Sequence, residues 1–309
     1  MRGSIKWQVN QVFQTINQIG SSKHMAKMEA RAEGHTTWHE IGKNIDIYSY
    51  STLDLYRDVA KDLMNYAKEQ FSIKDIEKLN SEVVKSFLET KIADGVKYST
   101  FQTYAAALEK LEVALNKYSE INDKGNTYNF SETIREIRQE AREVLDRSVE
   151  TRAYEDPKGL IENIKDEKFQ ILAEVQYNGG FRISEINHVS PEQFKENNIF
   201  EVWDGKGGKD REIQLPENVY SEFKELVENN INENYNKFTF DENQYREAIK
   251  EGAELSGQEY HGSHGLRWNF AQETFAELQE SGFSYEESLQ EVSNLLGHER
   301  PDITEHYLL

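Results

Sequence analysis

The last sixteen residues of the chain, Asn294 to Leu309, read N-L-L-G-H-E-R-P-D-I-T-E-H-Y-L-L. A Gly-His pair ends an apolar run at His298, and Pro301 then breaks the helix. Tyr307 follows His298 by nine residues. A single histidine or tyrosine is most often a packing residue, so the interpretation of this stretch depends on basic groups further upstream.

Those basic groups occur in three upstream stretches. Arg182 follows a Gly-Gly turn in G-G-F-R-I-S-E-I, so its guanidinium can project from a helix start and bind two phosphate oxygens. Glu185, three residues later, can orient a neighbouring basic group. Lys206 lies in a glycine-rich turn, where a flexible amine can reach a leaving oxygen. His264 and Arg267 are three residues apart, which places them on one face of a helix.

Residues 199–215 predict a β-hairpin. The strands I-F-E-V-W and R-E-I-Q-L flank the turn D-G-K-G-G-K-D, which carries Lys206 and Lys209. Apolar periodicity around the hairpin predicts helices over 166–177, 217–230, 241–255, 264–278 and 284–295. The second half of the chain therefore reads as helices around one small antiparallel sheet.

The first half reads as helices throughout. Apolar spacing predicts helices over 4–19, 52–70, 81–93 and 99–118, with Ser81 and Ser99 as N-caps, and a charged helix over 131–150. Two sets of polar residues in this half each allow a structural and a functional interpretation. A basic stripe of Lys23, Lys27 and Arg31 is either a solvated face or a phosphate-binding arm. Thr100, Gln102 and Thr103, at a helix N-terminus rich in alanine, suit either a DNA groove or close helix packing.

Length and charge limit the organisation of the protein. A chain of 309 residues favours two domains, and the character of the sequence changes near residue 150. The net charge is −20, with 21 basic and 23 acidic residues before position 151 but 15 and 33 after it. Such acidity weakens long-range attraction to nucleic acid, and it also fits a salt-adapted host. Local basic surface therefore has to carry any nucleic-acid contact.

Composition also bears on the compartment. The chain has no cysteine, so it forms no disulfide and no thiolate metal site. It contains no apolar run near the length of a membrane span, and its first residues lack the apolar region of a signal peptide. We therefore expect a cytoplasmic protein.

Taken together, the motifs resemble those of the tyrosine recombinase (phage integrase/Xer) family. The matching stretches are G-G-F-R-I-S-E-I, G-K-G-G-K-D-R, H-G-L-R, L-L-G-H and the final tyrosine. The resemblance covers roughly residues 150–309, and residues 46–118 match the family's helical core-binding domain more loosely. It implies a mainly α protein, with a helical core-binding (SAM-like) domain and an α+β catalytic domain that holds a small antiparallel sheet. The expected domains are a possible N-terminal arm at 1–45, a DNA-binding domain with a linker helix at 46–150, and a catalytic domain at 151–309.

The resemblance also implies a role for each catalytic candidate. Tyr307 would attack a scissile phosphate to give a 3′-phosphotyrosyl link, which conserves bond energy, so no cofactor is expected. Arg182 and Arg267 would stabilise the transition state, and His264 and His298 would bind the phosphate or assist proton transfer. Lys206 is the expected general acid, with Lys209 as its rival. DNA contacts are expected from eight residues: Lys23, Lys27, Arg31, Thr100, Gln102, Thr103, Lys209 and Arg211.

The implied partner is double-stranded DNA, bound by a homotetramer at two sites, without a membrane or a nucleotide cofactor. The implied task is integration or excision of a mobile element, or resolution of replicon dimers. The alternatives are a type IB topoisomerase, which acts as a monomer, and a DNA-binding accessory protein that has lost catalysis. Family members usually continue past the tyrosine into a helix that docks on a neighbouring subunit. Here Leu308 and Leu309 follow, so we expect either a truncated chain or a different coupling of subunits.

Overall fold

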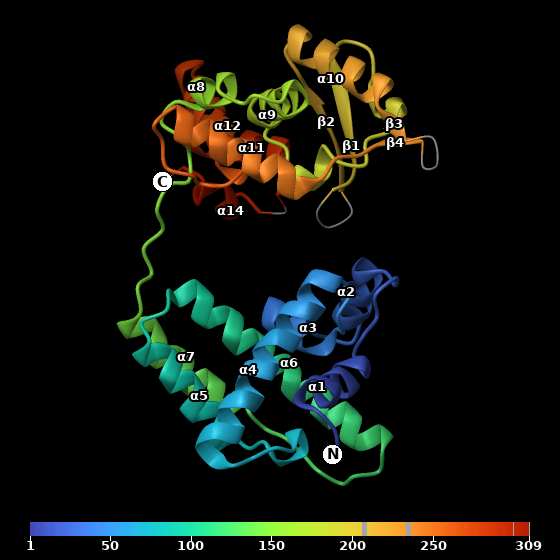
Figure 1. Cartoon of the computed structure of the whole chain (residues 1–309), viewed down its shortest axis with the longest axis vertical. Coiled ribbons are helices and arrows are strands. Elements are labelled where there is room, and N and C mark those ends of the chain that lie inside the picture. The colour runs from blue at the N-terminus through green and yellow to red at the C-terminus, as the bar shows by residue number, and fades with distance from the viewer. Residues whose placement is uncertain (206–208, 233–235, 299, 309) are drawn as a thin grey trace. The chain divides into compact units, whose positions relative to one another are not determined.

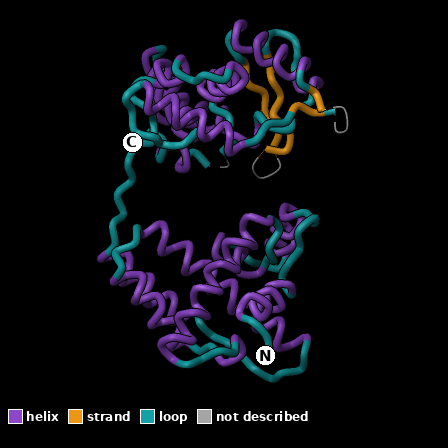
Figure 2. The backbone as a smooth tube through the Cα atoms, in the orientation of Figure 1, coloured by secondary structure: helices purple, strands orange, loops and turns teal. Residues whose placement is uncertain are grey.

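The computed structural model describes residues 1–205, 209–232, 236–298 and 300–308, with the side chains of residues 38, 39, 204 and 209 also left undescribed. The chain forms two compact units, Met1–Ser148 and Val149–Leu309. The strands of the described residues lie in the second unit (Figure 2). Among the residues described, no helix combines the length and the apolar character needed to cross a bilayer.

The first unit consists of helices joined by short loops (Figure 1). They are α1 (Ile5–Gln14), α2 (Lys23–Ala32), α3 (Trp38–Asn44), α4 (Tyr50–Phe71), the 3₁₀ turn η1 (Ile76–Lys78), α5 (Ser81–Ala93), α6 (Tyr98–Ile121) and α7 (Ser131–Val144). The long helices α4 and α6 pack against each other and bury the apolar residues that recur at helical spacing, such as Leu63 and Leu108. The predicted helical character of this half is confirmed.

Residues 1–45 divide between two apolar clusters of the first unit. Val9, Val12 and Phe13 of α1 are fully buried in the main core, where α1 packs on α4 and α6. The short helices α2 and α3 contribute instead to a small separate cluster around Ala30 and Ile41. The first helix is therefore part of the core of this unit.

Both predicted N-caps lie one or two residues away from the observed ones. The helix α5 is capped by Asn80, whose side chain accepts a hydrogen bond from the backbone N–H of Val83 at 3.0 Å, and Ser81 is its first helical residue. The helix α6 begins at Tyr98 after Lys97, so Ser99 lies inside the first turn. Asparagine and serine cap equally well, so composition alone did not distinguish Asn80 from Ser81, whereas α6 begins without a side-chain cap.

A buried carboxylate joins α6 to α7. Glu112 is 5% exposed, and its Oε2 accepts hydrogen bonds from the backbone N–H groups of Phe130 and Ser131, the latter at 2.6 Å. Its Oε1 lies 3.4 Å from the Nζ of Lys43 at the end of α3. The first backbone N–H groups of a helix have no partner within the helix, so an acidic side chain from another element satisfies them.

The second unit consists of helices and two small antiparallel sheets (Figure 1). Its elements are α8 (Pro157–Glu162), α9 (Glu167–Gly179), the 3₁₀ turns η2 (Ile183–Glu185) and η3 (Pro191–Gln193), β1 (Ile199–Gly205), β2 (Lys209–Gln214), α10 (Glu217–Asn229), β3 (Ile231–Asn232), β4 (Lys237–Phe238), α11 (Glu242–Leu255), α12 (His264–Glu280), α13 (Tyr285–Leu296) and α14 (Asp302–Glu305). The helix α12 packs on both α9 and α13. The start of α12 meets the C-terminal ends of both helices, where Arg267 donates to the carbonyls of Gly180 and Leu296.

The strands β1 and β2 form the predicted antiparallel hairpin. Phe200 pairs with Ile213 and Val202 pairs with Arg211, and the inward face of Phe200, Val202 and Ile213 is buried. The pair β3 and β4 was not predicted, because two residues per strand are too few for an alternating pattern. The predicted class, mainly α with a small antiparallel sheet, is confirmed.

The link between α6 and α7 gives a stability prediction. Replacing Glu112 by alanine leaves the backbone N–H groups of Phe130 and Ser131 without their acceptor, so we expect the free energy of unfolding to fall by about 3 kcal/mol. Urea denaturation followed by circular dichroism measures the change. The control is Glu120→Ala, at an exposed position of the same helix, for which we expect less than about 0.5 kcal/mol. Equal losses in the two variants would refute the capping role.

Candidate active site

The turn between α9 and η2 positions the first catalytic candidate, Arg182. Gly180 ends α9 in the left-handed conformation, with φ +60°, and a Cβ at this position would lie 2.3 Å from the ring of Phe270. Glycine is therefore required here both for the backbone angle and for the close approach. Two residues later, the guanidinium of Arg182 donates to Glu185 Oε1 at 2.7 Å, and its side chain is 17% exposed.

Glu185 lies among three arginines. Its carboxylate accepts hydrogen bonds from Arg182 and, in a bidentate pair at 2.7 and 3.0 Å, from Arg211. The Nη1 of Arg267 lies 3.9 Å away. Burial by itself raises the pKa of Glu185, but the hydrogen bonds and charge of Arg211, with the charge of Arg267, outweigh it and lower the pKa to about 2. The carboxylate therefore stays ionised and fixes the arginines.

Arg267 is the largest fully buried side chain among the residues that the structure describes. Its guanidinium donates to the carbonyl of Gly180 and, at 2.6 Å, to the carbonyl of Leu296, which lie at the C-terminal ends of α9 and α13. Carbonyls at helix C-termini lack partners and carry partial negative charge, so a buried cation is stabilised there. Burial and the charge of Arg182 lower the pKa of Arg267 to about 10, which leaves it positively charged at neutral pH.

His298 lies against Arg267 just after α13. Gly297 ends that helix with φ +65°, and the Nη2 of Arg267 then lies 3.1 Å from the Nε2 of His298. A guanidinium can only donate, so Nε2 accepts and the proton of a neutral His298 lies on Nδ1. That Nδ1–H donates a hydrogen bond to the Oγ1 of Thr304, 2.7 Å away. Thr304 was not among the predicted residues.

Tyr307 is the residue on which these side chains converge. Its hydroxyl lies 2.9 Å from the Nε2 of His264, the first residue of α12. Its ring, 8% exposed, packs against Trp268 and His298, with centroids 5.1 and 5.3 Å away. The Cζ of Arg267 lies 5.9 Å from the ring centroid. A phenol hydroxyl thus lies beside an imidazole nitrogen and close to a buried positive charge.

The structure therefore brings five of the six catalytic candidates together within the second unit. They are Arg182, His264, Arg267, His298 and Tyr307. The sixth, Lys206, lies outside the described residues. Thr304 and Trp268 were missed, although Trp268 follows His264 by four residues, and that helical spacing indicates a shared face.

The structure does not support a DNA contact for Arg211. Its side chain is 9% exposed, and its guanidinium donates to Glu185 and, at 2.8 Å, to the carbonyl of Leu295. Arg211 pairs with Val202 on β2, and Val202 belongs to the buried face of the hairpin. Alternation along the strand was the signal that could have shown this. Arg211 instead positions Glu185.

The other DNA-contact candidates lie on separate elements. Lys23 and Arg31 are exposed on α2, and Lys27 beside them is partly exposed. In the first turns of α6, Thr100 is exposed, Gln102 donates to the hydroxyl of Tyr98, and the hydroxyl of Thr103 donates to the carbonyl of Ser99 at 3.2 Å. The side chain of Lys209 lies outside the described residues. These positions remain predictions.

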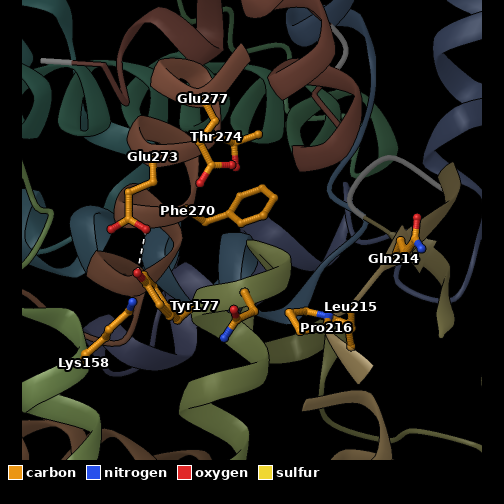
Figure 3. A pocket seen from close by; sticks show the side chains of 10 residues that line it. Lys158, Tyr177, Gln214, Leu215, Pro216, Phe270, Glu273, Thr274 and Glu277 are labelled. Atoms are coloured by element: carbon orange, nitrogen blue, oxygen red, sulfur yellow. Dashed lines mark hydrogen bonds between the residues drawn. The ribbon is translucent and has the colours of Figure 1, made fainter. Parts of the chain in front are cut away.

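A pocket of about 550 Å³ lies against α12, beside α9 and the end of β2 (Figure 3). It is lined by Phe270, Glu273 and Glu277 of α12 and by Tyr177 of α9, whose hydroxyl donates to Glu273 at 2.6 Å. None of the described catalytic candidates lines it. The pocket is therefore separate from the site around Tyr307.

A buried phenol beside imidazoles and fixed arginines, on a helical frame with one small hairpin, defines the class of tyrosine-type site-specific recombinases. The chain belongs to the phage integrase family: the model described as Phage integrase family matches residues 143–308. No curated protein sequence matches the chain significantly.

Solved structures agree with this fold. The Tn1549 transposon integrase, solved in complex with transposon right end DNA, superposes with a TM-score of 0.57 at 15% sequence identity, covering 93% of this chain and 94% of that one. The lambda integrase, solved as a dimer bound to a COC′ core site, gives a TM-score of 0.55 at 13% identity, with 93% and 94% covered. At such low identity the likeness establishes the fold of the chain.

The low pKa of Glu185 makes the stability of the second unit depend on pH. The pKa of Glu185 falls from 4.5 to about 2 on folding. Above pH 4.5 the ionised carboxylate therefore contributes about 3 kcal/mol to the free energy of unfolding, and this contribution is lost as the pH falls through about 2. We expect Glu185→Gln to lower the free energy of unfolding by about 3 kcal/mol at pH 7. Urea denaturation between pH 7 and pH 2 measures it.

The difference between Glu185→Gln and the wild type should shrink below pH 4.5, because protonation removes the same charge from the wild type. The exposed Glu222→Gln is the control, for which we expect a change below about 0.5 kcal/mol. A constant difference across the whole pH range would contradict the electrostatic explanation.

Proposed function

We propose that Tyr307 is the nucleophile that cuts and rejoins DNA through a 3′-phosphotyrosyl intermediate. The observation that carries this proposal is the 2.9 Å contact between the Tyr307 hydroxyl and the Nε2 of His264, beside the buried charge of Arg267. A free phenol has a pKa of about 10, so a nearby proton acceptor is needed for attack at neutral pH. His264, in the tautomer with Nε2 unprotonated, is that acceptor.

The reaction balances without an external energy source. The Tyr307 oxygen forms a bond to the scissile phosphorus while the bond from phosphorus to the 5′-oxygen breaks, and the phenol proton passes to His264. The leaving 5′-oxygen takes a proton from a general acid, for which Lys206 remains our candidate. A 5′-hydroxyl then attacks the phosphotyrosyl bond and releases Tyr307, so the number of phosphodiester bonds is unchanged.

Two guanidiniums supply the positive charge that the transition state needs. Arg182 is the most exposed of the three arginines on Glu185 and donates to a non-bridging phosphate oxygen. Arg267 lies deeper, and its Nε has no hydrogen-bond partner among the described residues, which leaves one N–H for the phosphate. Because Tyr307 is 8% exposed, we expect DNA binding to shift its segment towards solvent.

The partner we propose is double-stranded DNA, with four copies of the chain acting on two sites. The tasks are integration or excision of a mobile element, or resolution of replicon dimers. Two similar structures support a DNA partner, since the Tn1549 transposon integrase was solved in complex with transposon right end DNA and the lambda integrase as a dimer bound to a COC′ core site. Residues 46–150 and the stripe of Lys23, Lys27 and Arg31 are proposed to bind the duplex, and residues 151–309 to carry out catalysis.

The nucleophile assignment is tested with nicked duplexes drawn from the DNA that flanks the gene. We expect wild type to form a covalent protein–DNA adduct and Tyr307→Phe to form none, with a rate loss above about 10³-fold because the attacking oxygen is removed. Denaturing electrophoresis measures the adduct. The exposed Tyr285→Phe, on α13, is the matched control and should cleave like wild type.

An adduct that persists in Tyr307→Phe would refute the proposed nucleophile. Relaxation of supercoiled DNA without exchange between two duplexes would identify a topoisomerase instead of a recombinase. DNA binding without any adduct would identify an accessory protein.

A further inference from the structure

Three residues at four-residue spacing on α12 contact Tyr307 at successive levels. His264 contacts its hydroxyl, Trp268 packs on its ring with centroids 5.1 Å apart, and the Nε2 of Gln272 donates to its backbone carbonyl at 2.9 Å. Residues four apart lie on one face of a helix, one above the other. One face of α12 therefore contacts Tyr307 from its hydroxyl to its backbone, and Gln272 is the residue that binds the backbone of Tyr307.

The amide of Gln272 has a second acceptor. Its Nε2 lies 3.2 Å from the Oγ1 of Thr151, in addition to the carbonyl of Tyr307. A primary amide nitrogen carries two hydrogens, so both hydrogen bonds form at once. Thr151 lies three residues after Ser148, the last residue of the first unit. Gln272 thus joins the segment that enters the second unit to the backbone of Tyr307.

The entering segment is itself fixed on α12. Tyr154 is 3% exposed, and its backbone N–H and carbonyl form hydrogen bonds of 2.9 and 2.8 Å with the side chain of Asn269. The hydroxyl of Tyr154 donates to the carbonyl of Gly262 at 3.0 Å. Gly265 allows this close packing, because a Cβ at that position would lie 2.5 Å from the ring of Tyr154. The position of Thr151 therefore depends on the first turns of the helix that carries His264 and Arg267.

We propose that Gln272 is a positioning residue that couples the position of Tyr307 to the position of the segment around Thr151 that enters the second unit. The inference rests on the proposed function, since Tyr307 is taken as the nucleophile. Any displacement of the chain that joins the two units is passed to Thr151, then to the amide of Gln272, and then to the carbonyl of Tyr307. When both units bind DNA, this segment is held in place and Tyr307 is positioned for attack. When the segment is displaced, the backbone of Tyr307 loses its hydrogen bond from Gln272.

The test compares single-turnover cleavage of a nicked duplex by the full chain and by Gln272→Leu, which keeps the size of the side chain but removes both donors. We expect the cleavage rate at saturating DNA to fall about tenfold, the effect of one lost hydrogen bond that places the nucleophile. The DNA concentration for half-saturation should change by less than about twofold, because the amide of Gln272 donates to two acceptors within the protein. The exposed Gln279→Leu, on the same helix, should match wild type in both.

Thr151 separates the positioning role from a general loss of packing. Thr151→Ser keeps the acceptor oxygen and should cleave like wild type, whereas the isosteric Thr151→Val should cleave about three times more slowly. In the Gln272→Leu background, Thr151→Val should cause no further loss. A wild-type rate in Gln272→Leu, or an equal effect of Thr151→Val in both backgrounds, would overturn the proposal.

Hydrogen exchange tests the same contact without DNA. The amides of Tyr307 and Leu308 donate to Thr304 and Glu305 at 2.9 and 3.1 Å, so they report on the last turn. We expect Gln272→Leu to speed their exchange about tenfold while the amides of α9 are unchanged. Equal exchange in wild type and variant would refute the positioning role, even if wild type formed no adduct and the proposed function failed.

Discussion

The carboxylate of Glu185 is the interaction on which the arrangement of the site depends. It holds three guanidiniums that would otherwise repel one another, with side chains that are 17% exposed in Arg182, 9% in Arg211 and 0% in Arg267. Removing one partner of a buried ionic network leaves uncompensated charge, which costs several kcal/mol. The network therefore fixes the direction of each arginine and also contributes to the stability of the unit. Arg182 is the most exposed of the three, whereas Arg211 is mostly buried and Arg267 is fully buried.

Helix ends meet at this network. The guanidinium of Arg267 binds the final carbonyls of α9 and α13, and both helices end in a left-handed glycine, Gly180 and Gly297. Each glycine reverses the chain within one residue, so that Arg182 and His298 follow directly beside the helix ends. The buried cation and the helix termini stabilise one another. The same contacts therefore hold the fold together and position the site.

The charge of the whole chain says little about the charge at this site. The net charge is −20, and the acidic excess lies after residue 150, in the unit that holds the site. Around Glu185, however, three arginines surround one carboxylate, which leaves a local excess of two positive charges. Because interactions between exposed charges are screened beyond about 8 Å at physiological salt, a phosphate in the site responds mainly to these near groups. An acidic unit and a site with a local excess of positive charge are therefore compatible in one domain.

The sequence by itself predicted the main helices and the hairpin, and it singled out five described residues, Tyr307 among them, that the fold brings together, because apolar periodicity and motif spacing are local records of buried faces and of residue chemistry. It did not determine that Arg211 turns inward to Glu185, that Thr304 accepts from His298, or that Gln272 joins Thr151 to Tyr307. These contacts join residues 26, 6, 121 and 35 positions apart, and no repeat in the sequence relates such pairs. Only the packing of α9, α12 and α13 around Arg267 decided them, since the partner of a buried polar group is whichever acceptor the folded chain brings within about 3 Å.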